Sequence, residues 1–188
     1  HSSFKDLIIA LPLSPPLPPI VPPGQGAYQY TNVATATIWG GDLEAEVRFR
    51  EQWQFRTQFS GQIADITSRE AIQKVYGVSA DRVPLELVPP FKGSTSARWT
   101  DGSRRYWVES TARWAWRTNR LPPPTPGVGQ LTAFKKEYIV GDLMAGAMLS
   151  GHRLTVGIRN FTDRAYQPAL AAVEDPGLSF VGSLSTNF

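Results

Sequence analysis

Glu44 and Glu46 are the residues of this chain whose type and spacing come closest to a catalytic arrangement. They lie two positions apart, so an extended strand places both carboxylates on one face. Two neighbouring acids can share the roles of general acid and general base. Arg48 and Arg50 fall on the same predicted face, however, and an arginine-rich polar wall is the simpler interpretation of these alternating charges.

Imidazole and thiol groups are scarce. The histidines are His1 and His152, and the sequence contains no cysteine. Transition-metal sites draw mainly on these two side-chain types. Sequences typical of serine hydrolases, phosphate-binding loops and zinc peptidases are also absent. The sequence therefore predicts neither an enzyme nor a bound metal or cofactor.

The charged residues belong to a ribbon with two different faces. From Leu43 to Phe49 and again from Trp53 to Ile63, apolar residues alternate with polar ones across a break of three residues, Arg50 to Gln52. Successive side chains of a strand point to opposite faces, so one face of this hairpin is apolar and the other is charged. A soluble sandwich has the same period of two, and the pattern alone leaves open whether the apolar face meets lipid or a protein core.

The composition favours an all-β fold. Of 188 residues, 41% are hydrophobic and 16 are proline and 16 glycine, which is unfavourable for a helical protein. No apolar run approaches the roughly 20 residues of a membrane-spanning helix, so a membrane role requires a barrel. The net charge of +3 is small and the arginines are dispersed, which argues against nucleic-acid binding.

The order of strands and turns predicts an antiparallel meander of about eight strands. Tight turns at Arg50 to Gln52, Asp101 to Arg104 and Ser150 to Arg153 alternate with long connections. The pairs Asp101-Gly102 and Ser150-Gly151 are expected to supply the residues that tolerate positive φ. Short turns at one end and long loops at the other are typical of outer-membrane barrels. The predicted strands are Phe4 to Ala10, Tyr28 to Phe49, Trp53 to Ile66, Phe91 to Thr100, Tyr106 to Arg117, Tyr138 to Leu149, Leu154 to Phe161 and Leu178 to Phe188.

Two local patterns refine this prediction. Ser68 is a candidate helix cap and Gly77 a candidate helix end, so one long connection is expected to hold a short helix. On the strand from Tyr106 to Arg117, aromatic residues stand at both ends of the apolar face, with Trp114 at the far end. Aromatic rings at two heights resemble the girdles of membrane interfaces, although tryptophans in a sandwich core are an alternative.

Several motifs in order resemble the TonB-dependent outer-membrane receptors. Tyr30 to Ala36 followed by Gly40 to Glu44 is similar to the family's Y-x-N-x-x-x-A and G-x-E-x-E stretch, with Asp42 in place of glutamate. The stretches that resemble the late part of the family's barrel are Val88 to Pro90, Tyr138 to Leu143, Gly157 to Tyr166 (close to G-x-x-N-L-x-D-x-x-Y) and Pro176 to Phe180 with terminal Phe188, where Leu178 replaces the usual arginine.

The resemblance implies that residues 1–188 are the C-terminal part of a transmembrane barrel of about 22 strands. The family's plug domain and TonB box have no counterpart in this chain, and we expect an open curved sheet in isolation. The implied function is active uptake of a scarce nutrient, such as a ferric siderophore, haem or cobalamin, at the bacterial outer membrane. The implied partners are outer-membrane lipid, the TonB energy-transducing complex, the barrel-assembly machinery and the small-molecule nutrient, with no nucleic acid. A non-transport barrel or a soluble all-β binding or adhesion module remains the alternative.

Two groups of residues are candidates for function. Glu46, Arg48, Arg56, Glu109 and Arg113 are expected on the polar face, where they line the lumen or pack on the plug. Phe180, Leu184 and Phe188 share one face of the last strand and resemble the C-terminal signal recognised in barrel assembly.

Overall fold

The computed structural model describes residues 2–12, 28–85, 88–117, 120–124, 136–168, 171 and 173–186. Apart from one short helix, all of its regular elements are strands, which confirms the all-β prediction. The elements are β1 (Ser2–Pro12), β2 (Tyr28–Phe49), β3 (Trp53–Ile66), α1 (Arg69–Tyr76), β4 (Val83–Pro84), β5 (Lys92–Thr100), β6 (Tyr106–Ala115), β7 (Tyr138–Leu149), β8 (His152–Arg159) and β9 (Ser179–Thr186).

The strands form an open antiparallel meander, as predicted. Their order is β1-β2-β3-β5-β6-β7-β8-β9, so each long strand pairs with its neighbour in the sequence, and β1 and β9 are the ends. The two-residue strand β4 was not expected; it pairs with the end of β3 through Asp65↔Pro84 and Ile66↔Val83. The chain divides into two compact units, and the boundaries at Gly40/Gly41 and Gly61/Gln62 fall within β2 and β3.

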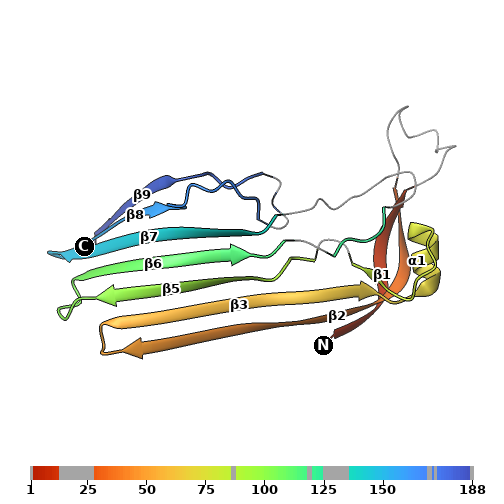
Figure 1. The fold of residues 1–188 in the computed structure, drawn as a ribbon, viewed down its shortest axis with the longest axis horizontal. Coiled ribbons are helices and arrows are strands. Elements are labelled where there is room, and N and C mark those ends of the chain that lie inside the picture. The colour runs from red at the N-terminus through yellow and green to blue at the C-terminus, as the bar shows by residue number, and fades with distance from the viewer. Residues whose placement is uncertain are drawn as a thin grey trace. The chain divides into compact units, whose positions relative to one another are not determined.

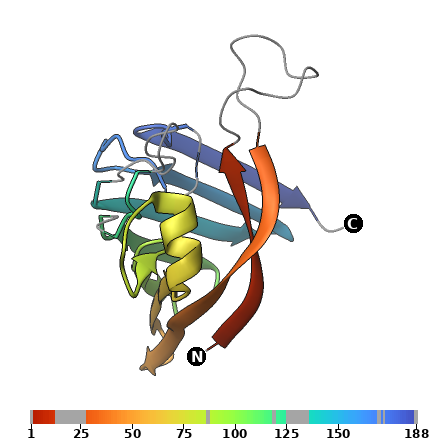
Figure 2. The same ribbon diagram turned by 90° about the vertical axis from the view of Figure 1, so that its right-hand side faces the viewer.

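The first unit consists of residues 1–40, 62–88 and 119–134. Within it, β1 pairs with the first part of β2, from Ser2↔Ile38 to Pro12↔Tyr28 (Figure 2). Helix α1 buries Ala71, Ile72, Val75 and Tyr76 against Ile66 of β3 and Val83 of β4. This spacing of apolar residues gives an eight-residue helix one buried face.

The ends of α1 are those expected from the sequence. Ser68 is the N-cap and its hydroxyl accepts a hydrogen bond from the Ala71 N–H at 3.3 Å. Gly77 ends the helix with φ 68°, and its N–H donates to the Gln73 carbonyl at 3.0 Å. Glu70 in the first turn and Lys74 in the last turn also complement the helix dipole.

The second unit consists of residues 41–61, 89–118 and 135–188. Strands β5 to β9 run side by side in it (Figure 1), with unbroken registers from Lys92↔Ala115 in the β5–β6 pair to Arg159↔Ser179 in the β8–β9 pair. Because paired residues share a face and neighbours along a strand alternate, this register extends the two faces of the β2–β3 hairpin across the unit.

The tight turns lie where they were expected, but one assignment was wrong. Positive φ occurs at Arg50, Glu51, Arg104, Ser150 and Gly151, and not at Gly102 as predicted. In that turn Asp101 fixes the backbone instead, since its carboxylate accepts from the N–H groups of Ser103 at 3.0 Å and Tyr106 at 2.8 Å. The Ser103 hydroxyl also donates to this carboxylate, and the hydrogen bonds from Ser103 and Tyr106 lower the pKa of Asp101.

Aromatic rings cover glycines on both faces of the second unit. The Trp114 ring lies over Gly93, the Phe161 ring over Gly141, and the Trp107 ring over Gly146, each within 3 Å of where a Cβ would stand. At Gly93 the Gln58 carbonyl oxygen also lies 2.6 Å from that position. These glycines therefore permit flat contact between ring and backbone, which a side chain would prevent.

Replacing Gly93 with alanine should destabilise the fold by about 1–3 kcal/mol, because the new methyl group overlaps a backbone oxygen that cannot rotate away. Gly41→Ala is the matched control, since nothing lies within 4 Å of its Cβ position. Denaturant unfolding of the intact receptor in lipid compares the two variants. Equal stability of both would contradict the close contact at Gly93.

Candidate functional site

The polar face of the second unit contains all five lumen candidates. In the β3–β5 and β5–β6 registers, Gln54 pairs with Arg98 and Arg98 with Glu109. Two residues further along each strand, Arg56 pairs with Ser96 and Ser96 with Thr111. The same face therefore continues over at least three strands. The structure thus places the candidates on one face but brings only some of them together.

Glu46, Arg48 and Arg56 form one ion cluster on β2 and β3. Glu46 accepts from Arg48 at 2.7 Å and from Arg56 at 2.9 Å, and the nearby Glu44 accepts from the Gln58 amide at 3.3 Å. The Arg48 and Arg56 side chains are 72% and 47% exposed, so water screens these pairs strongly. Glu46 is thus paired with two cations, and Glu44 lies 4.0 Å from the Arg56 Nε, so the cluster fits a polar wall better than a catalytic acid pair.

Glu109 belongs to a second group that the sequence did not reveal. Its partner is Arg98, 3.6 Å away on β5. The Arg98 guanidinium also lies 4.1 Å from the ring centroid of Trp107, a cation–π distance. Trp107 faces the polar side, where its ring covers Gly146. Only the strand register, which pairs Arg98 with Glu109, would have identified this group.

Arg113 is the centre of a third group, on β6 and β7. It binds Asp142 through two hydrogen bonds, Nε to Oδ2 at 2.7 Å and Nη2 to Oδ1 at 3.1 Å, in the bidentate geometry that makes such pairs strong. Its Nη1 donates to the Tyr166 hydroxyl at 3.0 Å, and that hydroxyl donates to Asp175. Burial and the bond to Asp175 raise the pKa of Tyr166, so the hydroxyl keeps its proton. Arg113 therefore attaches the β8–β9 loop to the sheet.

Asn160 fixes the other end of this loop. The residue is 2% exposed, and its φ is 49°, a left-handed conformation that asparagine tolerates. Its Nδ2 donates to the carbonyls of Arg164 at 2.9 Å and Pro176 at 3.4 Å, and its Oδ1 accepts from Thr162 and Arg164. The loop is thus closed around one buried amide.

Two further residues of the G-x-x-N-L-x-D-x-x-Y stretch also hold the loop. Asp163 accepts from the Leu178 N–H at 2.9 Å, and the Tyr166 ring packs against the Tyr138 ring at 4.3 Å between centroids, with the two planes tilted by 37°. Because Leu178 contributes its backbone, the departure from the family's arginine leaves the start of β9 intact. The motif therefore has a structural role, which is to fold the connection from β8 back onto β6 and β7.

The opposite face is apolar and aromatic. Phe59 lies 5.8 Å from Phe91 and 5.9 Å from Trp114, and Trp114 lies 6.1 Å from Trp116, all between ring centroids. Nearer the turns, Trp53 pairs with Trp99 and stacks on Phe55. Aromatic residues thus lie at both ends of this face, as the sequence predicted, with Thr57, Thr95 and Ala112 between them.

The two described members of the C-terminal group lie on this apolar face. Phe180 pairs with Ile158 and Leu184 with Leu154, and both are highly exposed, at 77% and 69%. Phe188 lies outside the described residues.

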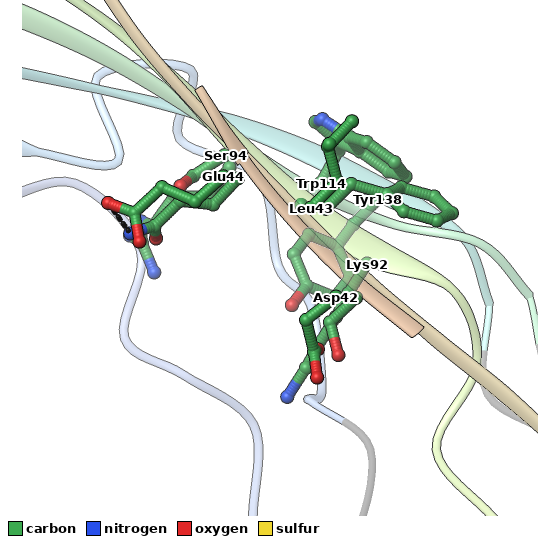
Figure 3. Close-up of a pocket in the computed structure, with 12 residues that line it drawn as sticks. Asp42, Leu43, Glu44, Lys92, Ser94, Trp114 and Tyr138 are labelled. Atoms are coloured by element: carbon green, nitrogen blue, oxygen red, sulfur yellow. Dashed lines mark hydrogen bonds between the residues drawn. The ribbon is translucent and has the colours of Figure 1, made fainter. Parts of the chain in front are cut away.

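One hollow of about 520 Å³ lies beside β2 and β3. Figure 3 shows Asp42, Glu44 and Lys92 on one side of the β2 ribbon and Trp114 on the other. Its lining therefore combines residues of both faces, and we do not assign it as a single binding site. Within the described ranges the structure holds no group of three or more potential metal ligands. None of the helices described is long and apolar enough to cross a membrane.

A family comparison decides what this arrangement is. The sequence model described as "TonB dependent receptor-like, beta-barrel" matches residues 1–161. The chain belongs to this TonB-dependent receptor family. The family consists of transport receptors and not of enzymes, and its barrels lie in the bacterial outer membrane, which is where this chain belongs.

Solved structures agree with this fold. The copper transporter OprC has a TM-score of 0.72 at 18% identity, over 95% of this chain and 26% of its own. FrpB, the iron transporter of Neisseria meningitidis, has a TM-score of 0.65 at 11% identity, over 95% and 26%. The ferripyoverdine receptor of the outer membrane of Pseudomonas aeruginosa has a TM-score of 0.63 at 14% identity, over 97% of this chain and 23% of its own. The chain thus spans about a quarter of the length of these proteins, and no protein of curated function matches it.

Proposed function

We propose that this TonB-dependent receptor chain is the C-terminal part of a barrel that takes up a scarce, metal-bearing nutrient, with energy from the TonB complex. Ferric siderophores, haem and cobalamin are the nutrient classes that we favour. The observation that supports this best is the division of the second unit into an aromatic apolar face and a charged face within one unbroken register. Such a sheet suits lipid on one side and a water-filled, plugged lumen on the other.

The polar face is the proposed path wall. Glu46, Arg48, Arg56, Glu109 and Arg113 are all held by partners within this face. Charges that are already paired present a hydrated wall of little net charge, along which a plug or a polar nutrient can move without meeting one strong site. The family match favours this interpretation over a soluble binding or adhesion module.

The names of three structural neighbours support a metal-bearing nutrient. One is named as a copper transporter, another as an iron transporter and a third as a receptor bound to ferripyoverdine. Since metals or metal carriers recur in these names, we propose a metal-bearing cargo for this receptor too. We place the plug domain and the TonB box upstream of residue 1 in the intact protein, with residues 1–188 as one C-terminal barrel segment.

The test is uptake by cells with and without the gene that encodes this chain. Cells are grown under iron limitation and supplied with radioactive iron as siderophore or haem complexes, radioactive copper, or labelled cobalamin, in parent and tonB-deleted backgrounds. We expect one cargo to accumulate only when both the receptor and TonB are present. If loss of the receptor changed the uptake of none of these cargoes, the proposal would be contradicted.

The C-terminal strand is the proposed assembly signal. Phe180 and Leu184 present apolar side chains on the lipid face, and Phe188 continues the same alternation in the sequence. We expect deletion of Phe188 to lower the amount of receptor in the outer membrane while leaving the ligand affinity of the folded molecules nearly unchanged. Quantitative immunoblots of outer-membrane fractions measure the first and equilibrium binding the second. Normal abundance with abolished uptake would assign Phe188 to transport instead.

A further inference from the structure

A second hollow, of about 310 Å³, lies on the polar face between the ends of β6 to β9 and the β8–β9 loop. It is lined by Arg113 and Asp142, by Tyr166 and Asp175 of the loop, and by Arg159 and Ser179 at the adjoining ends of β8 and β9. All of these residues belong to the second unit. The hollow therefore lies within the second unit, and the contacts of its lining residues determine which ligand groups it can bind.

Most polar groups of this hollow already have partners. Arg113 and Asp142 neutralise each other through two hydrogen bonds. Tyr166 accepts from Arg113 and donates to Asp175. These groups form a rigid wall, and a ligand that took one of them would break a bidentate ion pair or release the loop. They are poor ligand-binding groups for that reason.

Arg159 differs from these groups because its guanidinium is available to a ligand. Its side chain forms no hydrogen bond or ion pair with another described residue, although it lies near enough to Asp142 to affect that carboxylate electrostatically. In the β8–β9 register it stands directly opposite Ser179, whose hydroxyl is a further donor lining the hollow. A guanidinium fork and a hydroxyl on adjacent strands match the two oxygens of a carboxylate.

We propose that Arg159 and Ser179 form a subsite for a single carboxylate group of a ligand that enters the lumen. Asp142 is neutralised by Arg113, but Asp175 is bound by the neutral Tyr166 hydroxyl and keeps its negative charge, so sulfate, phosphate and other multiply charged anions are repelled more than a single carboxylate is. A carboxylate that carries a neighbouring hydroxyl or amino group gains a further contact, since Tyr166 binds only Oδ2 of Asp175 and Oδ1 can accept from that donor without releasing the loop. This inference rests on the proposed function, because it requires the polar face to line the lumen.

Chemical modification of arginine tests the subsite directly. The intact receptor is treated with phenylglyoxal, which reacts with accessible guanidinium groups, and modification of each arginine is followed by peptide mass spectrometry. Arg153 is the internal control, because it lies on the same face of β8 but does not line the hollow. Lactate is the carboxylate probe and sulfate, at equal ionic strength, is the polyanion probe.

We expect lactate at about twice its Kd to slow modification of Arg159 by about threefold, to leave Arg153 unchanged, and to protect better than sulfate. Asp175→Asn should raise protection by sulfate, since it removes one repelling charge. Equal slowing at both arginines, stronger protection by sulfate, or no protection by lactate would each overturn the subsite. Nutrient uptake is measured in cells that express the same receptor. Failed protection of Arg159 with intact uptake contradicts this inference alone. Protection of Arg159 without uptake contradicts the proposed function alone.

Discussion

Replacing Thr57 with arginine is expected to lower the free energy of unfolding of the receptor in lipid by about 2–4 kcal/mol, the cost of a cation near the middle of a bilayer. Thr57 points to the apolar face, between the aromatic levels marked by Trp53 and Phe59, and it bonds Thr95 across the strands at 3.1 Å. An arginine there must place its charge among hydrocarbon chains or distort the bilayer to reach water.

Gln58→Arg is the matched control, one residue further along the same strand. Gln58 points to the polar face and already donates to Glu44 at 3.3 Å, so an arginine gains an opposite charge and remains hydrated. We expect a change below about 1 kcal/mol for this variant, as for an exposed ion pair. The measurement is denaturant unfolding of the intact receptor in lipid vesicles, followed by tryptophan fluorescence. Equal losses for the two variants would show that the faces are assigned wrongly.

Asn160→Ala is expected to destabilise the β8–β9 loop by about 2–4 kcal/mol. The substitution removes the Nδ2 donor from the carbonyls of Arg164 and Pro176, and each lost hydrogen bond costs about 0.5–1.5 kcal/mol. Alanine also tolerates the φ of 49° less well than asparagine, at a cost of about 1 kcal/mol. Hydrogen exchange of the Leu178 and Arg164 amides measures the opening of the loop.

Asn160→Asp distinguishes the two causes, because aspartate keeps the acceptor and tolerates the left-handed backbone but loses the Nδ2 donor. The expected order of loop stability is asparagine, then aspartate, then alanine. Exchange rates in Asn160→Ala that match those of the parent would mean that the buried amide does not close the loop.

The sequence predicted the strand faces and the helix ends, which depend on neighbours along the chain. Alternation predicted the two faces of β2 and β3, and Ser68 and Gly77 predicted the ends of α1, because capping and strand direction are local properties. Exact turn geometry was less predictable. Arg104 adopts the positive φ that was expected at Gly102. The backbone of this turn is determined by hydrogen bonds to Asp101 and not by the conformational freedom of glycine.

Contacts between distant segments could not be predicted from spacing. Arg113 was selected only as a member of the polar face, whereas its partners Asp142 and Tyr166 lie 29 and 53 residues away. The pairing of Arg98 with Glu109 depends on the register between β5 and β6, which a single sequence does not specify. The short strand β4 is held by its partner β3 and has no pattern of its own.

Site-directed spin labelling along β3 tests most directly the central claim that one face of this sheet meets lipid and the other meets water. The 188 residues contain no cysteine, so each cysteine introduced from Trp53 to Ser60 gives a single label once any cysteines elsewhere in the receptor are replaced. Collision rates with oxygen, which concentrates in lipid, and with a water-soluble nickel complex are measured in vesicles. The two-faced sheet predicts that oxygen accessibility is high at Trp53, Phe55, Thr57 and Phe59 and that nickel accessibility is high at the alternate positions, with a period of two. High nickel accessibility at all of these positions, or no alternation, would contradict the claim.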